Sequence, residues 1–300
     1  MEKKTINRCI WLLNTLLQSR GLSLEELNER WQKSCLGDGS RLSRTTFNTH
    51  CNVLSDMFGI TIQCEHHHPY RYSVRSRSAL HGNRMHQWLI NAFSLSNMIE
   101  AGHNMQERIL LEDIPHGSEY LQTIIEAMQQ GREIYVEHQK FGSQKTIQHL
   151  QPYAMKAHRQ RWYVVGYIHE HGAIRTIALD RVLSMDLTDE KYTVPRDFDA
   201  EEYYAHSIGI YVRQGEKPQK VLLRAYGVNV NYLRSLPLHQ SQREVKTCTG
   251  EYSDFQYTLC LTPDLTNEIL SMGEMAEVLQ PESLRTAVRE RFQASLKLYL

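Results

Sequence analysis

The stretch Gln160-Arg161-Trp162-Tyr163-Val164-Val165-Gly166-Tyr167 and the stretch after it, Ile174-Arg175-Thr176-Ile177-Ala178-Leu179-Asp180-Arg181-Val182, decide the fold of the central part of the chain. Both are rich in β-branched and aromatic residues, which favour extended strands. A turn at His171-Gly172 separates them. The two stretches therefore predict neighbouring antiparallel strands.

Further runs of the same kind flank this pair, and a helix precedes them. The predicted strands are 133–139, 145–151, 160–167, 173–179 and 182–187, with a turn at Gly142-Ser143 between the first two. Ser118 begins a short helix that ends near Gly131 and turns its apolar residues Leu121, Ile124, Ile125 and Met128 to one side. One helix followed by five short antiparallel strands predicts a small SH3-like or Sm-like β-barrel.

The two opening stretches resemble the signature of the WYL domain, a Trp-Tyr-Leu strand followed by an Arg-x-Phe-x-Leu-Asp-Arg-Ile strand. Val164 stands at the Leu position and Ile177 at the Phe position, and both keep the apolar character. The upstream Gln151-Pro152-Tyr153 is similar to the family's Pro-Tyr segment. The resemblance implies a bacterial transcription regulator whose WYL domain, here about 119–195, senses a ligand.

The resemblance also implies a ligand site. In the family, the Tyr of the first motif and arginines of the second line a basic pocket. At the matching positions of this chain, the candidates are Tyr153, Tyr163, Arg175, Asp180 and Arg181, with Asp180 orienting an arginine. Because arginine binds phosphate through paired donors and tyrosine stacks on bases, a nucleotide or single-stranded nucleic acid is the implied ligand. Two other interpretations stay open: Asp180 and Arg181 form a salt bridge at a barrel corner, and Trp162 belongs to the core.

Residues 1–78 show the pattern of a winged helix-turn-helix domain. Apolar residues at helical spacing predict a first helix up to Gly21, and Ser23-Leu24-Glu25-Glu26 is a capping box that opens a second. Ser43 caps a third helix, whose apolar stripe is Phe47, Cys51, Leu54 and Phe58, and Gly59 ends it. Residues 60–64 and 70–74 predict a hairpin. The loop before the third helix, about ten residues, is longer than the tight turn of the strict motif.

The exposed face of the third helix suits DNA recognition, because short hydrogen-bonding side chains reach base edges while arginine contacts phosphate. The candidate DNA contacts are Arg44, Thr45, Asn48, Thr49 and Asn52 on this helix and Arg71 in the hairpin. An ordinary three-helix bundle with a solvated polar face is the alternative. His66-His67-His68 in the hairpin turn fits a polar wing tip better than a metal site, since consecutive turn residues rarely point at one ion.

The last hundred residues predict a ferredoxin-like domain at 200–300. Strands at 220–226, 243–248, 255–261 and 276–279 alternate with helices at 228–235 and 264–272 in the order βαββαβ. Pro281 is expected to open a final helix with Leu284, Val288, Phe292, Leu296 and Tyr299 inward. This part resembles the C-terminal extension of WYL regulators, the WCX domain, which the family uses for dimer contacts. Residues 79–118 are expected to form a helical linker.

Composition limits the functional classes. Lys plus Arg and Asp plus Glu are both 34, yet residues 1–78 carry 11 basic against 7 acidic residues, or +4, which favours an anionic partner there. No apolar run is long enough for a membrane helix or a signal peptide, so the expected location is the cytoplasm. The six cysteines form no CxxC pair, and no P-loop, GxGxxG, HExxH or GxSxG motif occurs. The prediction is therefore a protein that is not an enzyme and needs no cofactor.

Together these observations predict an α+β multidomain, homodimeric, sequence-specific DNA-binding regulator, more specifically a repressor, controlled by a ligand in its WYL domain. The family resemblance further implies control of antiviral defence genes. An alternative stays open: a nucleotide or nucleic-acid sensor that acts through a partner protein rather than on an operator. Under that alternative, Ala at Asn48 and Asn52 leaves nucleic-acid binding largely unchanged.

Overall fold

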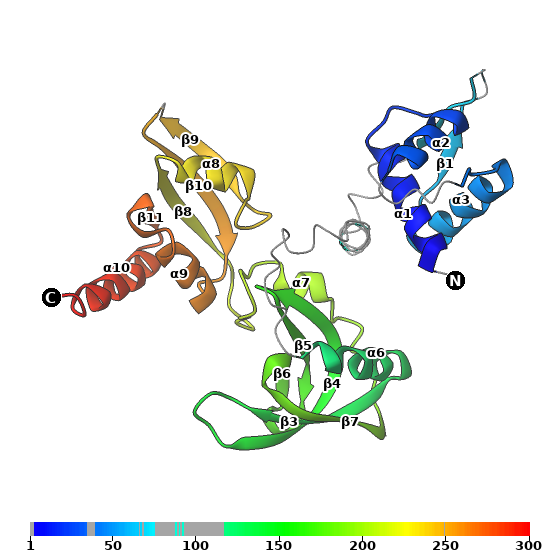
Figure 1. Ribbon diagram of the computed structural model, residues 1–300. Coiled ribbons are helices and arrows are strands. Elements are labelled where there is room, and N and C mark those ends of the chain that lie inside the picture. The colour runs from blue at the N-terminus through cyan, green and yellow to red at the C-terminus, as the bar shows by residue number, and fades with distance from the viewer. Residues whose placement is uncertain are drawn as a thin grey trace. The chain divides into compact units, whose positions relative to one another are not determined.

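The computed structural model describes residues 3–34, 40–65, 67, 69–75, 88, 90, 92, 117–248 and 250–300. The chain divides into two compact units, residues 1–112 and residues 113–300 (Figure 1). The expected linker at 79–118 and the expected turn histidines His66 and His68 lie largely or wholly outside the described residues. Among the described helices, none is both long and apolar enough to cross a bilayer.

Within residues 3–75, the described part of the N-terminal unit contains the three predicted helices and the predicted hairpin. Their bounds are α1 Lys3–Leu17, α2 Leu24–Lys33, α3 Arg44–Phe58, β1 Ile62–Cys64 and β2 Tyr72–Val74. Tyr72 also forms a bridge to Leu22, which joins the hairpin to the start of α2. One apolar core holds these elements together, with Leu13, Leu27, Phe47 and Leu54 almost fully buried.

Local capping defines the two helices nearest the expected DNA face. The Ser23 hydroxyl accepts from the Glu26 N–H, and the Glu26 carboxylate accepts from the Ser23 N–H at 2.8 Å, which confirms the predicted capping box. Ser43 caps α3 by accepting from the Thr46 N–H, and Gly59 ends α3 in the left-handed conformation with φ of 63°. His50 was not expected in the apolar stripe, but it is buried there because it follows the same helical face.

The second unit begins with a helix and an antiparallel five-stranded sheet. After a short 3-10 turn at Ser118–Tyr120 come α6 Leu121–Gln130, β3 Arg132–Gln139, β4 Lys145–His158, β5 Arg161–Ile168, β6 Ala173–Ala178 and β7 Val182–Lys191. The strands lie in the order β6-β5-β4-β3-β7. Ile124 and Ala127 of α6 pack onto a core that includes Ile134, Leu150 and Val164. Trp162 packs against this core but is only partly buried.

Strand β4 is seven residues longer than predicted. It continues through Pro152 and Tyr153 to His158, because the pairing with β5 shifts register between Pro152 and Ala154. Proline lacks a donor for the ladder, and a bulge is one of the places where a sheet accepts it. Pro152 therefore does not end the strand.

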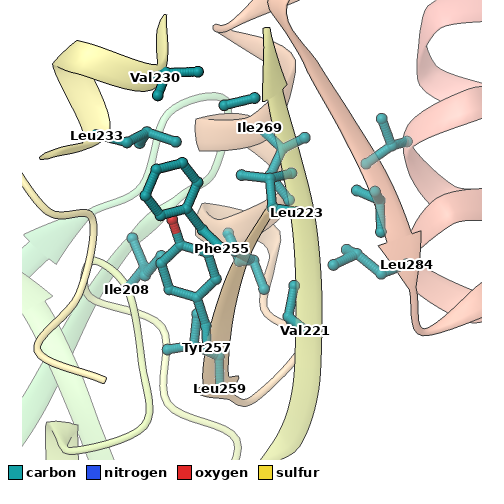
Figure 2. Packing of buried hydrophobic residues seen from close by; sticks show 14 residues of the cluster. Ile208, Val221, Leu223, Val230, Leu233, Phe255, Tyr257, Leu259, Ile269 and Leu284 are labelled. Carbon is teal, nitrogen blue, oxygen red and sulfur yellow. The ribbon is translucent and has the colours of Figure 1, made fainter. Parts of the chain in front are cut away.

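The C-terminal part of this unit contains a second sheet. A short helix, α7 Ala200–Tyr204, precedes β8 Gln219–Tyr226, α8 Asn229–Ser235, β9 Arg243–Cys248, β10 Tyr252–Leu259, α9 Pro263–Leu270, β11 Ala276–Gln280 and α10 Glu282–Leu296. The sheet order is β11-β8-β10-β9, with antiparallel neighbours throughout. Figure 2 shows the rings of Phe255 and Tyr257 at the centre of its core, beside Val230 and Leu233 of α8. The sequence did not predict α7.

The final helix departs from two expectations. Pro281 occupies the N-cap position, so the helix begins one residue later, at Glu282. Leu284 and Val288 are buried as predicted, whereas Phe292, Leu296 and Tyr299 are 38%, 58% and 87% exposed. The hydrophobic core covers the apolar face of the first half of the helix but does not extend to the second half. Phe292 and Leu296 instead line a groove together with Ala276 and Val278 of β11.

Candidate DNA and ligand sites

The polar residues predicted for α3 share one exposed face. Arg44, Thr45, Asn48, Thr49 and Asn52 are all exposed, while Phe47, Leu54 and Phe58 on the other side are buried. The Thr49 hydroxyl donates to the Thr45 carbonyl at 3.1 Å. Within the described part of the chain, no hydrogen bond or ion pair occupies the side chains of Arg44, Asn48 or Asn52. This face therefore offers free donors and acceptors on a helix that is fixed by its buried side.

Arg71, predicted as a further DNA contact, is engaged inside the N-terminal unit. Its guanidinium donates to the Gly21 carbonyl at 2.8 Å and pairs with the Glu26 carboxylate at 3.0 Å. These bonds tie β2 to the start of α2. The Ser23 N–H donates to the Glu26 carboxyl and Arg71 pairs with it, and together these hold the pKa of Glu26 below the ordinary value. A role of Arg71 at DNA stays a prediction, and its observed partners are structural.

A side-chain amide sets the long connection between α2 and α3. Buried Asn28 accepts from the Leu42 N–H at 2.6 Å and donates to the carbonyls of Leu42 and Leu24. Leu42 lies two residues before the first residue of α3. The longer loop that departs from the strict motif is thus fixed at its far end by α2.

Among the predicted ligand residues, Tyr163, Asp180 and Arg181 lie in one neighbourhood. Tyr163 is 6% exposed, and burial raises the pKa of its hydroxyl, while the charges of Arg161, Asp180 and Arg181 also act on it. The Asp180 carboxylate lies 3.3 Å from Arg161 on β5. Asp180 therefore does pair with an arginine, but with Arg161, which the sequence reading did not select.

Arg175 projects from the other face of the strand pair. In the β5–β6 ladder Tyr163 pairs with Ala178, whereas Arg175 pairs with Gly166. Tyr163 and Gly166 are an odd number of residues apart on β5, and successive residues of a strand face opposite sides of the sheet. Arg175, the partner of Gly166, therefore points to the opposite face from Tyr163. Arg175 is exposed and lies near Tyr203, whose pKa it lowers against the larger rise from burial.

Tyr153 belongs to a third neighbourhood. Its ring lies 5.0 Å from that of Phe198 and 6.0 Å from that of Tyr192, and its hydroxyl donates to Gln151. Gln151 in turn donates to the buried carboxylate of Glu133, which also bonds His169. The five predicted ligand residues are thus divided among three places on the sheet.

Several polar groups near Arg181 were not singled out from the sequence. His138 on β3 and Gln148 on β4 are about 95% buried, and within the described residues both His138 nitrogens and the Gln148 carbonyl oxygen lack partners. The same holds for one Asp180 oxygen and for Nε of Arg181. The Arg181 guanidinium stacks on the ring of Phe141 at 4.6 Å. The alternation of β3 places His138 on the same inward face as Ile134 and Val136, and this alternation is the feature of the sequence that could have predicted its burial.

Two histidine–carboxylate pairs on the same sheet suggest metal chemistry but do not assemble a site. His149 pairs with Glu170 at 2.5 Å and His169 with Glu133 at 3.0 Å. Among the residues described, no group of three or more His, Cys, Asp or Glu is arranged to hold a metal ion. Each carboxylate here already has a histidine or amide partner.

Comparison with known proteins identifies two domains. Residues 119–187 match the family model of the WYL domain, and residues 217–296 match that of the WCX domain. Both domains were expected from the sequence, and the matches confirm them. Among curated proteins, none matches the chain.

Solved structures show weaker likenesses. "Proteasome accessory factor B/C (PafBC) of Arthrobacter aurescens" is 19% identical, with a TM-score of 0.40 over 98% of this chain and 47% of that chain. A "CRISPR Cas-related protein" is 12% identical, with a TM-score of 0.39 over 99% of this chain and 83% of that one. The chain therefore spans about half the length of the first of these structures.

Proposed function

This chain is a protein with a WYL domain followed by a WCX domain, and we propose that it is a ligand-responsive transcription regulator that binds a specific duplex DNA site. The observation that carries the proposal is the exposed polar face of α3, where Arg44, Asn48 and Asn52 have no side-chain partner among the described residues. Asparagine reads adenine through two hydrogen bonds in the major groove, and arginine contacts phosphate.

The proposed modules follow the predicted limits. Residues 1–78 form the winged helix-turn-helix domain, 79–118 the linker, 119–195 the small β-barrel that senses the ligand, and 200–300 a ferredoxin-like domain. The excess of four basic residues in the first module supports its assignment to DNA. Regulation rather than catalysis is the proposed role of the other two. Cytoplasmic location stays a prediction from the lack of long apolar runs, repression stays a prediction, and control of antiviral defence genes stays a prediction from the resemblance.

We assign dimer formation to the C-terminal domain. Its edge strand β11 and helix α10 line a groove that is mainly apolar and also carries Glu277, Arg285, Arg289 and Gln293. Phe292 and Leu296 remain exposed there in the single chain. A two-fold dimer would present two copies of α3 to a pseudo-palindromic site, which doubles a weak half-site contact.

The ligand we propose is a nucleotide or a short single strand at the WYL domain. Around Tyr163, Arg161 and Arg181 supply donors for phosphate, and Asp180 orients Arg161. Lys156, the cross-strand neighbour of Tyr163, bonds the carbonyl of Gly209 in the segment that leads to the C-terminal domain. Control by a ligand requires that the ligand binds two arrangements of the chain with different affinity. We place the origin of that difference at the contact between Lys156 and Gly209.

The test is a mobility shift with the DNA immediately upstream of the protein's own gene and a scrambled duplex as competitor. We expect a discrete complex that survives the competitor and disappears when Asn48 and Asn52 are both changed to Ala. Met57→Ala is the matched control, because Met57 is exposed on the same helix but points away from the side of Asn48 and Asn52. Equal binding by the double variant, or binding to single strands alone, would favour the sensor that acts through a partner protein.

A further inference from the structure

The two central strands of the C-terminal sheet, β8 and β10, have one face in the core and one face toward solvent. Alternate residues, Leu223 and Phe255 among them, are buried in the core together with residues of α8 and α9 (Figure 2). Because side chains alternate along a strand, their neighbours point to the opposite side of the sheet, the open face. On β8 and β10 these neighbours are Leu222, Arg224, Tyr226, Tyr252, Asp254 and Gln256. Each of them except Asp254 remains partly exposed.

Two tyrosines lie side by side on the open face. Tyr226 pairs with Tyr252 across β8 and β10, and the centres of their rings are 6.3 Å apart. In the sheet order β11-β8-β10-β9 both tyrosines belong to the central strands. RNA-recognition domains use a four-stranded sheet in which aromatic side chains of the exposed face stack on a few bases. The two tyrosines therefore lie where a sheet of this kind would bind bases.

Arg224 adds a fixed planar cation beside the tyrosines. Its Nε and Nη2 donate to the two carboxylate oxygens of Asp254 at 2.7 and 3.0 Å, and its guanidinium carbon lies 3.9 Å from the centre of the Tyr252 ring. Asp254 thus occupies the edge of the guanidinium and Tyr252 one of its faces, while 24% of the side chain stays exposed. A guanidinium plane held in this way can stack on a base with its other face, as an aromatic ring does.

Positive charge exceeds negative charge on the open face. Among the described strand residues, strand pairing and alternation place four basic and two acidic side chains there: Lys220, Arg224, Arg243, Lys246, Asp254 and Glu277. Lys246 and Arg243 are exposed on the edge strand β9, and the Lys246 ammonium lies 5.4 Å from the centre of the Tyr252 ring. Bonding to Tyr252 raises the pKa of Lys246, so the ammonium is charged at neutral pH. Cations beside stacking rings suit the phosphates and bases of a single strand.

We propose that the open face of the C-terminal sheet binds single-stranded RNA. Bases stack on Tyr226 and on the Arg224 guanidinium that lies over Tyr252, while Lys246 and Arg243 bind phosphates along β9. An apolar protein segment would take water from these charges without replacing it, whereas a nucleic acid supplies both stacking surfaces and anions. This function goes beyond the regulator proposed above, because it uses neither α3 nor the WYL sheet.

Glu277 of β11 favours ribose over deoxyribose. Its carboxylate accepts from the Tyr226 hydroxyl at 2.7 Å and pairs with Arg285 at 2.8 Å, and these two partners lower its pKa. The ionised carboxylate has further lone pairs that can accept a hydrogen bond. A 2′-hydroxyl beside a base on Tyr226 is a donor that DNA lacks. Glu277 also lines the groove between β11 and α10, so the proposed RNA site ends at that groove.

The test is fluorescence anisotropy of the full chain with a labelled single-stranded RNA of mixed sequence, about ten nucleotides long, and with a DNA strand that differs only in the 2′-hydroxyls. We expect the RNA to bind about tenfold more tightly than the DNA. Tyr226→Ala and Tyr252→Ala should each weaken RNA binding about tenfold, and Tyr252→Phe should retain it. Tyr232→Ala is the matched control, because Tyr232 is 67% exposed on α8, on the other side of the sheet.

Three further variants locate the RNA and separate binding from folding. Arg181→Ala, in the WYL domain, should leave RNA affinity unchanged. Lys246→Ala changes an exposed side chain and should reduce the slope of log affinity against log salt by about 0.7, the loss of one phosphate contact of a single strand. Glu277→Ala should bring the affinities for RNA and DNA together, because it removes the acceptor for the 2′-hydroxyl. Partial unfolding lowers both affinities and leaves their ratio as it is.

Absence of RNA binding would overturn the proposal, as would equal affinity for the DNA strand or unchanged RNA affinity in both tyrosine-to-alanine variants. Loss of RNA binding in Arg181→Ala, with Tyr226→Ala unaffected, would move the strand to the WYL domain and overturn it too. The mobility shift on the upstream duplex should be the same for Tyr226→Ala and the wild type. Failure of the RNA site and failure of the DNA-binding regulator are therefore distinguishable.

Discussion

The ammonium of Lys156 on β4 donates to the carbonyl of Gly209 at 2.6 Å and lies 3.6 Å from the centre of the Tyr204 ring. Gly209 belongs to the segment between α7 and β8, and the next two residues, Ile210 and Tyr211, donate their N–H groups to the Asp264 carboxylate of α9. One lysine therefore fastens the sheet of the WYL domain to a loop that the C-terminal domain also holds.

The pH dependence of stability should reveal this lysine. Burial lowers the pKa of Lys156 from 10.5 to about 8 in the folded chain. Between these two pH values the unfolded chain keeps a proton that the folded chain releases, so the contribution of Lys156 to stability rises with pH across that interval. Because the side chain is only partly buried, the expected gain is on the order of 1 kcal/mol.

The measurement compares urea unfolding of the wild type and Lys156→Met at pH 7.5 and 9.5. Other groups titrate equally in both proteins, so the difference between the two free energies of unfolding isolates Lys156. That difference should move in favour of the wild type at the higher pH. Parallel pH profiles would contradict the assignment of a depressed pKa.

Replacing Gly209 should loosen the same contact from the other side. An added Cβ would lie 2.2 Å from the Asp264 carboxylate, which must then release the N–H groups of Ile210 and Tyr211. These two N–H groups are part-buried and exposed, so water can replace some of the lost bonding, and we expect Gly209→Ala to lower the free energy of unfolding by about 1 kcal/mol more than its control. The control is Gly215→Ala, where φ is similarly positive, 80° against 77°, but the space is open. Equal urea midpoints in the two variants would refute the clash.

The elements that the sequence predicted correctly depend on local chemistry. The Ser23–Glu26 capping box and the αL glycine at Gly59 involve neighbours within a few residues, so their spacing is visible in the sequence. The WYL match depended on two spaced motifs within one pair of strands. In each case the residues that decide the structure are close together in the chain.

The candidate site was harder to predict, because it depends on register and on contacts between distant segments. Whether Arg175 shares a face with Tyr163 is decided by which residues pair across β5 and β6, and the motif does not encode this pairing. The partner of Asp180 is Arg161, nineteen residues away. From the sequence, Phe141 beside Gly142 is indistinguishable from an ordinary residue of an exposed loop. Its contact with the Arg181 guanidinium is visible only in the structure.

The two arginines predicted at DNA should differ in salt dependence. Arg44 is exposed at the first turn of α3, so Arg44→Ala should reduce the slope of log affinity against log salt by about 0.9, the loss of one phosphate contact. Arg71 is bonded to Gly21 and Glu26, so Arg71→Ala should leave that slope unchanged. Fluorescence anisotropy on the duplex between 50 and 200 mM salt (roughly the range in which phosphate contacts are best resolved) provides both slopes. A reduced slope in Arg71→Ala would restore Arg71 to the DNA interface.

Asn28 and Asn52 should show opposite phenotypes, which tests whether the loop and the face of α3 have separate roles. Asn28→Ala removes the partner of both the N–H and the carbonyl of buried Leu42, so we expect a loss of about 1–3 kcal/mol in the unfolding of the N-terminal unit. Asn52 is exposed and its replacement should leave stability unchanged while duplex affinity falls. Well below its melting temperature, Asn28→Ala should bind duplex as the wild type does, because the residues of the α3 face are intact. Thermal unfolding and mobility shift on both variants decide the matter: a binding defect in Asn28→Ala at low temperature would mean that the loop itself touches DNA.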